Sequence, residues 1–326
     1  MESRTKNRQD LEAIRAMVQR AYGHAQLLNG EQFAIELTHG WFNAAYKITL
    51  RDSRQVVLKV APSPNTDVMT YERSLMLNEL AAMDVLSRRA TVRIPSVDFV
   101  DTTRTICDGF WFFMHYIEAD NFGVLLEAGA LSAETKQRLY EQLGTMNREL
   151  NGIVGPHFGP IGGPGFFTWR EAFLDLVHAA LNDGIRARVD LGLAYDTIRS
   201  LVIKNSAVLE EVREPRFVSW DLWPSNVMVR DGKIVAAIDH ERALYADPLM
   251  EAGFLGDELP VFGDSASFQL GYGFSEWSEP EQRRRRLYSL YFALVMTIEP
   301  SFRGHQDPKQ HAWARERIAD IVALLR

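Results

Sequence analysis

Three polar side chains recur at fixed spacing in the segment FVSWDLWPSNVMVRDGKIVAAIDHERALYADP, residues 217–248. Asp221 and Asn226 lie five residues apart between two short apolar runs, and Asp239 ends a third run. Asp231-Gly232, between the second and third runs, is typical of a tight turn joining two strands. A lone Asp or Asn would indicate only a turn or a helix cap. The whole pattern predicts a hairpin that gathers two carboxylates and an amide.

This trio suits phosphoryl transfer. Carboxylate and amide oxygens are the ligands that Mg²⁺ prefers, and transfer from ATP also needs a carboxylate to orient the attacking hydroxyl. Asp221 and Asn226 match the Asp-x-x-x-x-Asn of a kinase catalytic loop, in which Asp accepts the hydroxyl proton and Asn holds metal. Asp239 follows at the end of the next strand, where kinases carry a second metal ligand.

The rest of the chain predicts an α+β fold with two lobes. Apolar periodicity indicates a small β-rich lobe over residues 1–116, which begins with an amphipathic helix at about 10–28, and a large helical lobe over 117–326. In the first lobe we expect three strands within 33–62, a helix at 68–89, and two strands within 94–118 joined by a tight turn at Asp108-Gly109. In the second we expect helices at 132–150, 169–182, 191–211, 282–299 and 309–326.

WDLWPSNVMV and KIVAAIDHERALYADPLMEAGF resemble the signature region of the aminoglycoside phosphotransferase and choline kinase-like family, relatives of protein kinases. The resemblance covers most of the chain and is weakest at residues 1–28 and after 255. It implies a bilobal protein-kinase-like fold, with Asp221 as the catalytic base and Mg²⁺ held by Asn226 and Asp239. It also implies that Asp247, before Pro248, forms a structural corner.

The same resemblance assigns a lysine to the nucleotide. Lys59, in VVLKVAP on the third expected strand, corresponds to the lysine that contacts the α- and β-phosphates of ATP. Such a lysine needs a carboxylate to hold it, and the following helix offers Glu79 and Glu72. Glu79 is preferred because it precedes Pro95 by a separation similar to the family's, and Glu72 is the alternative.

Two further segments are implied to contact ATP. The loop THGWFNAAYKI would lie over the triphosphate, with Gly40 and Asn43 in a backbone turn whose N–H groups approach phosphate, although the chain has no Walker motif. FWFFMHYIEAD would be the adenine-binding connector. There the backbone of His115 and Ile117 would bond the adenine edge, and Met114 would pack beside the ring.

One departure from the family leaves two functions open. The usual His-Gly before the catalytic Asp is replaced by Ser219-Trp220, and that His braces the loop without reacting. The first function is an ATP-dependent phosphotransferase acting on a hydroxyl of a small molecule. The second is a kinase-like module that binds nucleotide or a ligand with little or no turnover. The enzyme is favoured because the expected site is intact: Lys59, Asp221, Asn226 and Asp239.

Composition restricts the partners. A net charge of −7 and a pI near 5.7 argue against nucleic acid and are compatible with a cationic acceptor. Cys107 is the only cysteine, which excludes an intrachain disulfide and a multi-cysteine zinc site and favours a cytoplasmic location. No apolar run predicts a signal or a membrane span. The oligomeric state is not indicated.

The acceptor is the least determined part. Carboxylates in FLGDELPVFGDSASFQLGYGFSEWSEPE are candidates for binding a cation, and Trp277 and Tyr272 for stacking on a sugar or ammonium. Aminoglycosides, other sugars, choline and homoserine-like metabolites all stay open. A protein kinase is disfavoured because Asp-Phe-Gly and Ala-Pro-Glu are missing. The candidate carboxylates are Asp257, Glu258, Asp264, Glu276 and Glu279.

Overall fold

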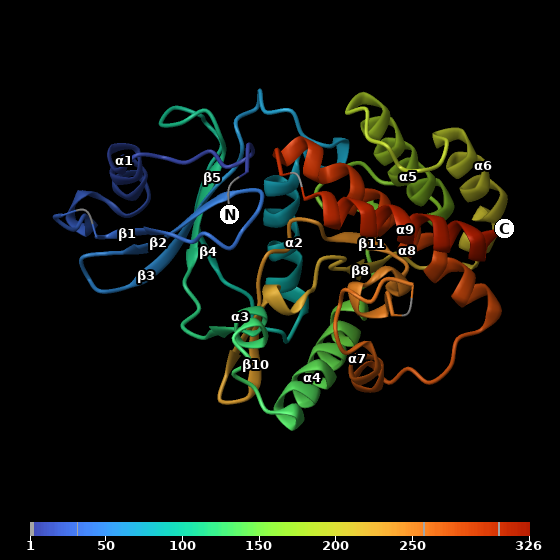
Figure 1. Ribbon diagram of the computed structural model, residues 1–326. Helices are drawn as coiled ribbons and strands as arrows, with labels where there is room; N and C mark the ends of the chain where they lie inside the picture. The colour runs from blue at the N-terminus through green and yellow to red at the C-terminus, as the bar shows by residue number, and fades with distance from the viewer. Residues whose placement is uncertain (1–2, 31, 257, 306) are drawn as a thin grey trace. The chain divides into compact units, whose positions relative to one another are not determined.

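The structure is a computed structural model that describes residues 3–30, 32–256, 258–305 and 307–326. Its contacts divide the chain into two compact units. The first comprises Met1–Val68, Pro95–Glu118 and Ser301–His305, and the second comprises Met69–Ile94, Ala119–Pro300 and Gln306–Arg326. Strands and helices both contribute, so the expected α+β class is confirmed (Figure 1).

The first unit contains a five-stranded antiparallel sheet in the order β1-β2-β3-β5-β4. Buried and half-buried residues alternate in β2, and β3 is buried along nearly its whole length, as expected for a central strand. The strands are β1 (Ala34–Glu36), β2 (Ala44–Thr49), β3 (Gln55–Val60), β4 (Val97–Asp101) and β5 (Trp111–His115).

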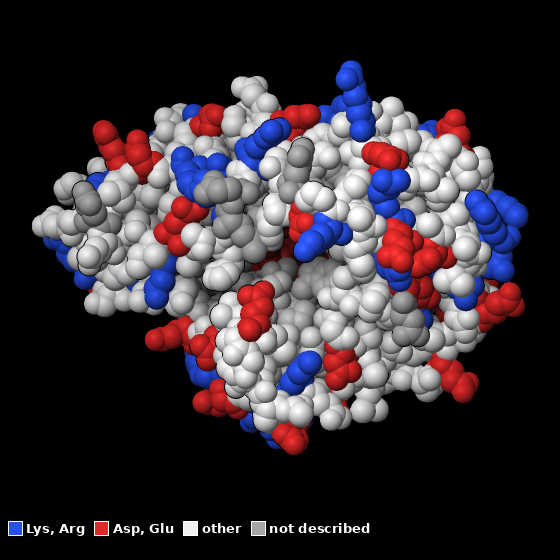
Figure 2. All heavy atoms as spheres, viewed as in Figure 1, with Lys and Arg blue, Asp and Glu red and all other residues white. Residues whose placement is uncertain are grey.

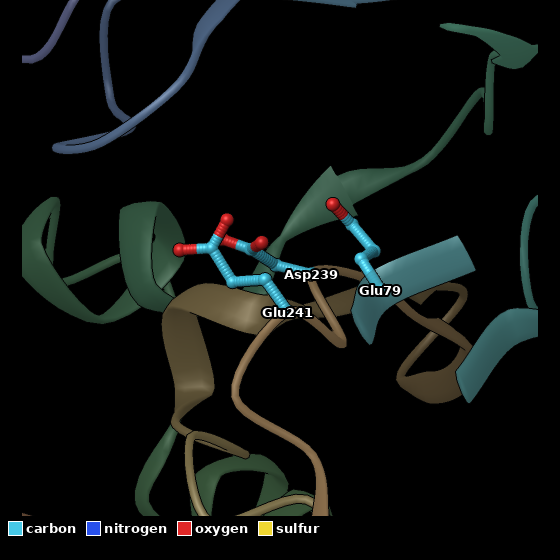
Figure 3. A group of neighbouring side chains, drawn as sticks. All are labelled: Glu79, Asp239 and Glu241. Carbon is cyan, nitrogen blue, oxygen red and sulfur yellow. The ribbon is translucent and has the colours of Figure 1, made fainter. Parts of the chain in front are cut away.

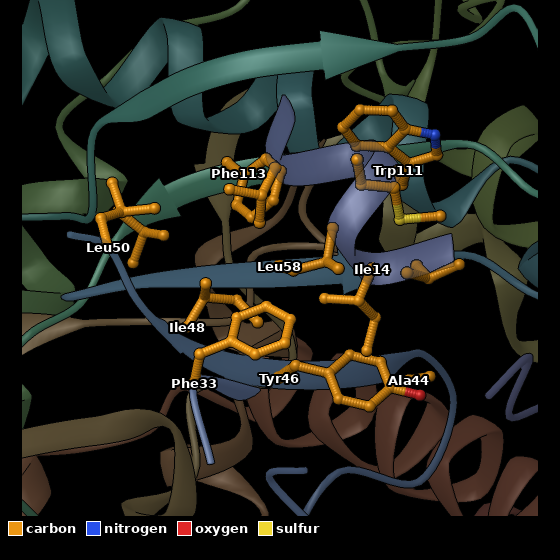
Figure 4. Close-up of a cluster of buried hydrophobic side chains, with 13 residues drawn as sticks. Ile14, Phe33, Ala44, Tyr46, Ile48, Leu50, Leu58, Trp111 and Phe113 are labelled. Carbon is orange, nitrogen blue, oxygen red and sulfur yellow. The ribbon is translucent and has the colours of Figure 1, made fainter. Parts of the chain in front are cut away.

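Helix α1 (Leu11–Tyr22) packs on this sheet and closes its core. Asp10 caps the helix by accepting the N–H of Ala13 at 2.8 Å, and Gly23, at φ 86°, ends it. The buried face of α1 joins side chains from the strands in one apolar cluster (Figure 4). Each fully buried aliphatic or aromatic side chain contributes roughly 1.5–3 kcal/mol. The helix ends earlier than expected, and a 3₁₀ turn at His24–Gln26 follows.

The second unit is mainly helical and contains two small sheets of three strands, in the orders β10-β9-β6 and β7-β11-β8. Its strands are β6 (Asp120–Asn121), β7 (Gly159–Pro160), β8 (Arg216–Val218), β9 (Val227–Arg230), β10 (Lys233–Ala237) and β11 (Leu244–Ala246). Its helices are α2 (Leu75–Arg89), α3 (Phe122–Glu127), α4 (Ala133–Asn151), α5 (Trp169–Arg186), α6 (Tyr195–Asn205), α7 (Ser265–Tyr272), α8 (Glu279–Arg303, whose last residues belong to the first unit) and α9 (Pro308–Leu325).

Several elements differ from the sequence-based expectation. The helix expected at 68–89 starts at Leu75, because Thr70–Glu72 form a separate 3₁₀ turn. Strands β4 and β5 end at Asp101 and begin at Trp111, so the connection is a longer loop and not a tight turn at Asp108-Gly109. The short helices α3 and α7 were not expected.

None of the described helices combines the length and the apolar composition that crossing a bilayer requires. On the face drawn in Figure 2, lysine and arginine side chains are interspersed with aspartate and glutamate.

Candidate active site

The loop between β8 and β9 holds Asp221 in a fixed conformation. Trp223 donates its backbone N–H to the carbonyl of Asp221 at 2.9 Å, and Asn226 donates its Nδ2 to the same carbonyl at 2.7 Å. The indole N–H of Trp223 donates to Oδ1 of Asp221 at 2.7 Å. The five-residue spacing therefore closes a tight loop in which Asn226 bonds back to Asp221.

Asp239 is tied to the same loop from the neighbouring strand. Strand β10 ends at Ala237, and the N–H of Ile238 donates to the carbonyl of Asn226 at 3.0 Å. Asp239 then adopts a left-handed backbone, φ 63°, which Asp tolerates better than most residues. The turn directs the chain away from the strand, and it places Asp239 beside the loop that carries Asn226.

Three carboxylates lie close together just after the end of β10. One oxygen from each of Glu79, Asp239 and Glu241 lies within 4.8 Å of the others, and Glu79 and Glu241 are buried (Figure 3). Asn78 explains the approach of α2, because its Nδ2 donates to the carbonyls of Glu241 and Ala243 at 2.8 and 2.7 Å. Oxygen-only ligands of this kind fit Mg²⁺.

Glu241 was missed by sequence reasoning. The sequence places Glu241 two residues after Asp239, in IDHER. A carboxylate in a loop does not by itself indicate a metal site, because its neighbours in space are not known from the sequence. Asn226 is linked to the segment that carries Asp239 by the hydrogen bond from the N–H of Ile238 to its carbonyl. Since its Nδ2 is engaged with Asp221, Oδ1 is the atom that Asn226 could offer to a cation.

A second group surrounds the carboxylate of Asp221. Oδ2 lies 3.6 Å from Nε of Arg242, whose Nη2 contacts Glu299 at 3.2 Å. Burial raises the pKa of Asp221, Arg242 opposes the rise, and Asp239 adds to it. Sequence reasoning missed Arg242 and Glu299, since no local pattern connects them.

The backbone before Asp221 is held by a buried carboxylate. Glu251 accepts the N–H groups of Ser219 at 2.9 Å and Trp220 at 3.0 Å, and Nδ2 of Asn151 at 3.0 Å. Burial raises the pKa of Glu251, while these donors and Asn147 oppose the rise. The departure from His-Gly therefore leaves the loop backbone anchored.

Asp247 contacts structural partners, as the sequence analysis expected. It caps the 3₁₀ turn Pro248–Met250 by accepting the N–H of Leu249 at 3.1 Å. Its other oxygen accepts from Arg284 at 2.9 Å and from the hydroxyl of Tyr288 at 2.7 Å. A carboxylate with all these donors is a packing element of the helical unit.

Lys59 lies on β3 with 8% of its surface exposed, opposite Ala45 on β2 and Phe112 on β5. It belongs to the first unit and Glu79 to the second, so the pairing of the two stays a prediction. Glu72 does not lie on α2. Its carboxylate accepts the backbone N–H of Met69 at 2.9 Å and caps the 3₁₀ turn.

The expected phosphate loop joins β1 to β2. Thr5 anchors it by donating its hydroxyl to the carbonyl of Phe42 at 2.9 Å. Asn43, immediately before β2, is buried, whereas Gly40 is exposed. A Cβ at Gly40 would meet nothing nearer than 3.9 Å, so local packing does not require glycine there.

The expected adenine connector follows β5. The backbone N–H of His115 donates to the carbonyl of Ser96 at 2.9 Å, so this donor is used within the sheet. Its ring lies at the surface beside the hydroxyl of Ser96. Met114 is half-buried and Ile117 is buried. The contacts of these residues with adenine stay predictions.

Two of the five carboxylates considered for the acceptor have structural contacts. Glu258 pairs with Arg285 at 3.0 Å, and Asp264 caps α7 by accepting the N–H of Ser267 at 3.0 Å. Glu276 and Glu279 are exposed. Asp257 lies outside the described residues.

The two aromatic candidates are also engaged. The ring of Trp277 packs edge-on against Phe254 at 5.3 Å and under the guanidinium of Arg285 at 4.1 Å. The hydroxyl of Tyr272 donates to Oδ1 of Asn151 at 2.9 Å. These contacts account for Trp277 and Tyr272 without an acceptor.

Comparison with known proteins identifies the family. The sequence model of the phosphotransferase enzyme family, APH, matches residues 34–288, which is most of the chain. The chain therefore belongs to this family, and it is a phosphotransferase enzyme, of a class whose acceptors are small-molecule hydroxyl groups. No curated protein matches its sequence.

Solved structures share the kinase-like fold at low sequence identity. A thermostable mutant of aminoglycoside phosphotransferase APH(4)-Ia, in complex with AMP-PNP and hygromycin B, has TM-score 0.66 and 18% identity, covering 95% of this chain and 98% of that one. The streptomycin–ATP complex of APH(2")-IIa has TM-score 0.61 and 17% identity, covering 96% and 97%. A candidate fructosamine-3-kinase from Thermobifida fusca has TM-score 0.64 and 18% identity, covering 97% and 99%.

Proposed function

We propose that the protein transfers the γ-phosphoryl group of ATP to a hydroxyl of a small molecule, with Asp221 as the catalytic base. The observation that carries this proposal is the bonded loop of Asp221, Trp223 and Asn226, with Asp239 tied to it through Ile238. In phosphoryl transfer most of the rate comes from positioning and charge neutralisation, and a loop held this firmly supplies positioning.

Asp221 has an oxygen placed for the acceptor. Its side chain keeps 20% of its surface exposed, although the loop around it is largely buried. Oδ1 takes the indole N–H of Trp223, and each carboxylate oxygen has more than one lone pair. A hydroxyl that donates to Asp221 would be oriented with its oxygen toward the phosphoryl group, and its proton would pass to the carboxylate.

Mg²⁺ is the metal that the residues fit. Asn226 and Asp239 would hold it, and the two buried carboxylates beside Asp239 add to the negative field at that point. When bound, the metal would neutralise charge on the phosphate oxygens. This chain offers no cysteine or histidine ligand in the group that gathers around Asp239 in the described residues, which favours a hard cation.

Residues 1–116 would form the nucleotide-binding lobe and residues 117–326 the catalytic lobe. Lys59 would contact the α- and β-phosphates, and Glu79 would hold Lys59 or join the metal group. Gly40 and Asn43 would lie over the triphosphate. The connector residues Met114, His115 and Ile117 would bind adenine, His115 and Ile117 through backbone groups.

The acceptor class is proposed from the related structures. Complexes with hygromycin B and streptomycin show aminoglycosides bound to two proteins of this fold, and a third is described as a sugar-amine kinase. Hygromycin B, streptomycin and fructosamine are all hydroxylated and carry amines. We therefore propose an aminoglycoside-, sugar- or amino-alcohol-like acceptor for this chain.

The test is ADP release with Mg-ATP across a panel of hydroxylated amines, aminoglycosides and sugars. Wild type is compared with Asp239→Asn and with a surface control, Asp190→Asn, whose side chain is 71% exposed. Release stimulated by one class of acceptor, lost in Asp239→Asn and kept in Asp190→Asn, supports the proposal. Wild type that binds Mg-ATP but turns over no acceptor favours the alternative, a kinase-like binding module.

A further inference from the structure

Trp220 occupies a backbone conformation that glycine normally takes. Its φ is 58°, in the left-handed region, where an L-residue pays about 1–2 kcal/mol. The indole is nonetheless buried, with 3% of the residue exposed. It packs against Tyr71, Tyr291 and Phe292, with ring centroids 5.7, 5.4 and 5.1 Å away. The side chain therefore has a structural role that offsets the backbone cost.

The guanidinium of Arg242 lies against the same indole. Its Cζ is 5.4 Å from the ring centroid of Trp220 and 5.4 Å from that of Tyr71. Nη2 contacts both oxygens of Glu299 at 3.2 Å, and the hydroxyl of Tyr71 donates to Glu299 at 3.0 Å. Two aromatic rings and a carboxylate thus fix the plane of the guanidinium.

The atom that this arrangement leaves toward the catalytic loop is Nε. It lies 3.6 Å from Oδ2 of Asp221, and the exposed fractions of the Arg242, Asp221 and Glu299 side chains are 15, 20 and 16%. Ion pairs this far from solvent are screened less than surface pairs. A planar guanidinium can face two carboxylates and two rings at once, which a lysine ammonium cannot.

We propose that Arg242 is a positioning residue for Asp221, held in place by Trp220 and Glu299. Trp223 fixes one carboxylate oxygen of Asp221 from inside the loop, and Arg242 faces the other from outside it. The Ser219-Trp220 pair is then part of an alternative brace and not a sign of a degenerate loop. The inference rests on the proposed role of Asp221.

The experiment compares Arg242→Lys and Arg242→Gln with a matched control, Arg285→Lys. Arg285 is also buried, with 8% of its side chain exposed, pairs with Glu258 at 3.0 Å and lies 4.1 Å from the ring of Trp277. Neither of those partners belongs to the loop that carries Asp221. The control therefore reproduces the loss of a buried arginine that contacts a carboxylate and an aromatic ring.

Two measurements are made on each full-length variant. The first is kcat and the KM for ATP, by ADP release with the acceptor that stimulates wild type best. The second is amide hydrogen exchange of a peptide covering residues 217–226. We expect Arg242→Lys to lower kcat by about 10–100-fold with KM for ATP changed less than about twofold, because a small misplacement costs this much. Amide exchange of the 217–226 peptide should be faster in Arg242→Lys than in wild type and in Arg285→Lys.

The outcomes separate the inference from the proposed function. If Arg242→Lys and Arg285→Lys exchange and turn over alike, Arg242 is merely structural and the inference is wrong. If wild type turns over no acceptor, the proposed function fails, and exchange of the 217–226 peptide alone decides whether Arg242 braces the loop. Arg242→Gln must behave at least as severely as Arg242→Lys, since it loses the charge as well as the geometry.

Discussion

Trp223 donates its indole N–H to Oδ1 of Asp221 over 2.7 Å, from a position two residues further along the same loop. The backbone carbonyl of Asp221 accepts from Asn226 at 2.7 Å. Both polar ends of the residue are therefore fixed before any ligand binds. A group that is positioned in advance loses little freedom when the acceptor arrives, so more of the binding energy lowers the barrier.

Asp221→Asn is expected to abolish transfer and leave Mg-ATP binding largely intact. The amide is nearly isosteric and can still accept from Trp223, but it cannot take the proton of an acceptor hydroxyl. Turnover is measured by ADP release, and binding by titration calorimetry with Mg-AMP-PNP. Equal loss of turnover and binding would indicate a folding defect and contradict the role given to Asp221.

Trp220→Gly is expected to destabilise the protein although it removes an unfavourable backbone conformation. Relief at φ 58° is worth about 1–2 kcal/mol, whereas deleting a buried tryptophan costs roughly 3–5 kcal/mol. Packing wins, and we expect a net loss of about 2 kcal/mol in a denaturant titration. Trp220→Phe is the control, since it keeps a ring against Tyr291 and Phe292 and should lose less. A gain in stability for Trp220→Gly would show that the indole packing is weak.

The sequence predicted the parts of the fold that are encoded locally. Strand β2 alternates buried and half-buried residues, and α4, α5 and α9 are long enough for their apolar period to be read. Strands β6 and β7 have two residues each, which is too short for any periodicity. The eight residues of α7 likewise give only two turns, and its glycine-rich flanks read as loop.

In the candidate site, too, only the contacts between residues close in the sequence could be predicted. Asp221 and Asn226 bond within one loop, so their spacing in the sequence carried the information. Arg242 and Glu299 are 57 residues apart, and they meet only because α8 brings Glu299 beside the connection from β10 to β11, which carries Arg242. Asn78 on α2 donates to the carbonyl of Glu241 and so brings α2 close to it, and no spacing in the sequence predicts this contact. Long-range pairs of this kind depend on tertiary packing.

Glu251→Gln is expected to lower the free energy of unfolding by about 1–3 kcal/mol. Glu251 accepts backbone N–H groups from both Ser219 and Trp220, whereas the amide of Gln has one acceptor oxygen. One buried backbone donor is then left without a partner, and such a group costs roughly that amount. Denaturant titration measures the loss. An unchanged midpoint would mean that a water or a shifted backbone replaces the bond.

The effect of Glu251→Gln should also depend on pH. Burial raises the pKa of Glu251 above that of the unfolded chain, so the folded protein binds this proton more readily. The stability gained in this way is complete below the unfolded pKa of about 4.3 and is lost as the pH rises through the folded value. Gln has no such proton, so the stability difference between wild type and variant should shrink from about pH 4 toward neutrality. A difference that grows over this range would contradict the raised pKa.

Gly144→Ala is expected to destabilise the contact between α4 and α7. A Cβ at Gly144 would overlap the carbonyl oxygen of Phe268, and one at Gly271 would overlap the carbonyl of Glu141, so the two helices cross on their glycines. Alanine normally stabilises a helix interior by about 1 kcal/mol over glycine. Here the obstacle is backbone, which cannot rotate aside, and overpacking of a core costs about 1–3 kcal/mol or more.

Because the overlap is with backbone atoms, we place the cost at the upper end of this range, about 3 kcal/mol. After subtraction of the gain of about 1 kcal/mol from helix propensity, we expect Gly144→Ala to lose about 2 kcal/mol, seen as a lower midpoint of denaturant unfolding. Gly40→Ala is the matched control, because its Cβ would meet nothing nearer than 3.9 Å. It should leave the midpoint nearly unchanged. If Gly144→Ala were as stable as Gly40→Ala, α4 and α7 would be able to move apart at little cost. The close contact between the two helices would then contribute little to stability.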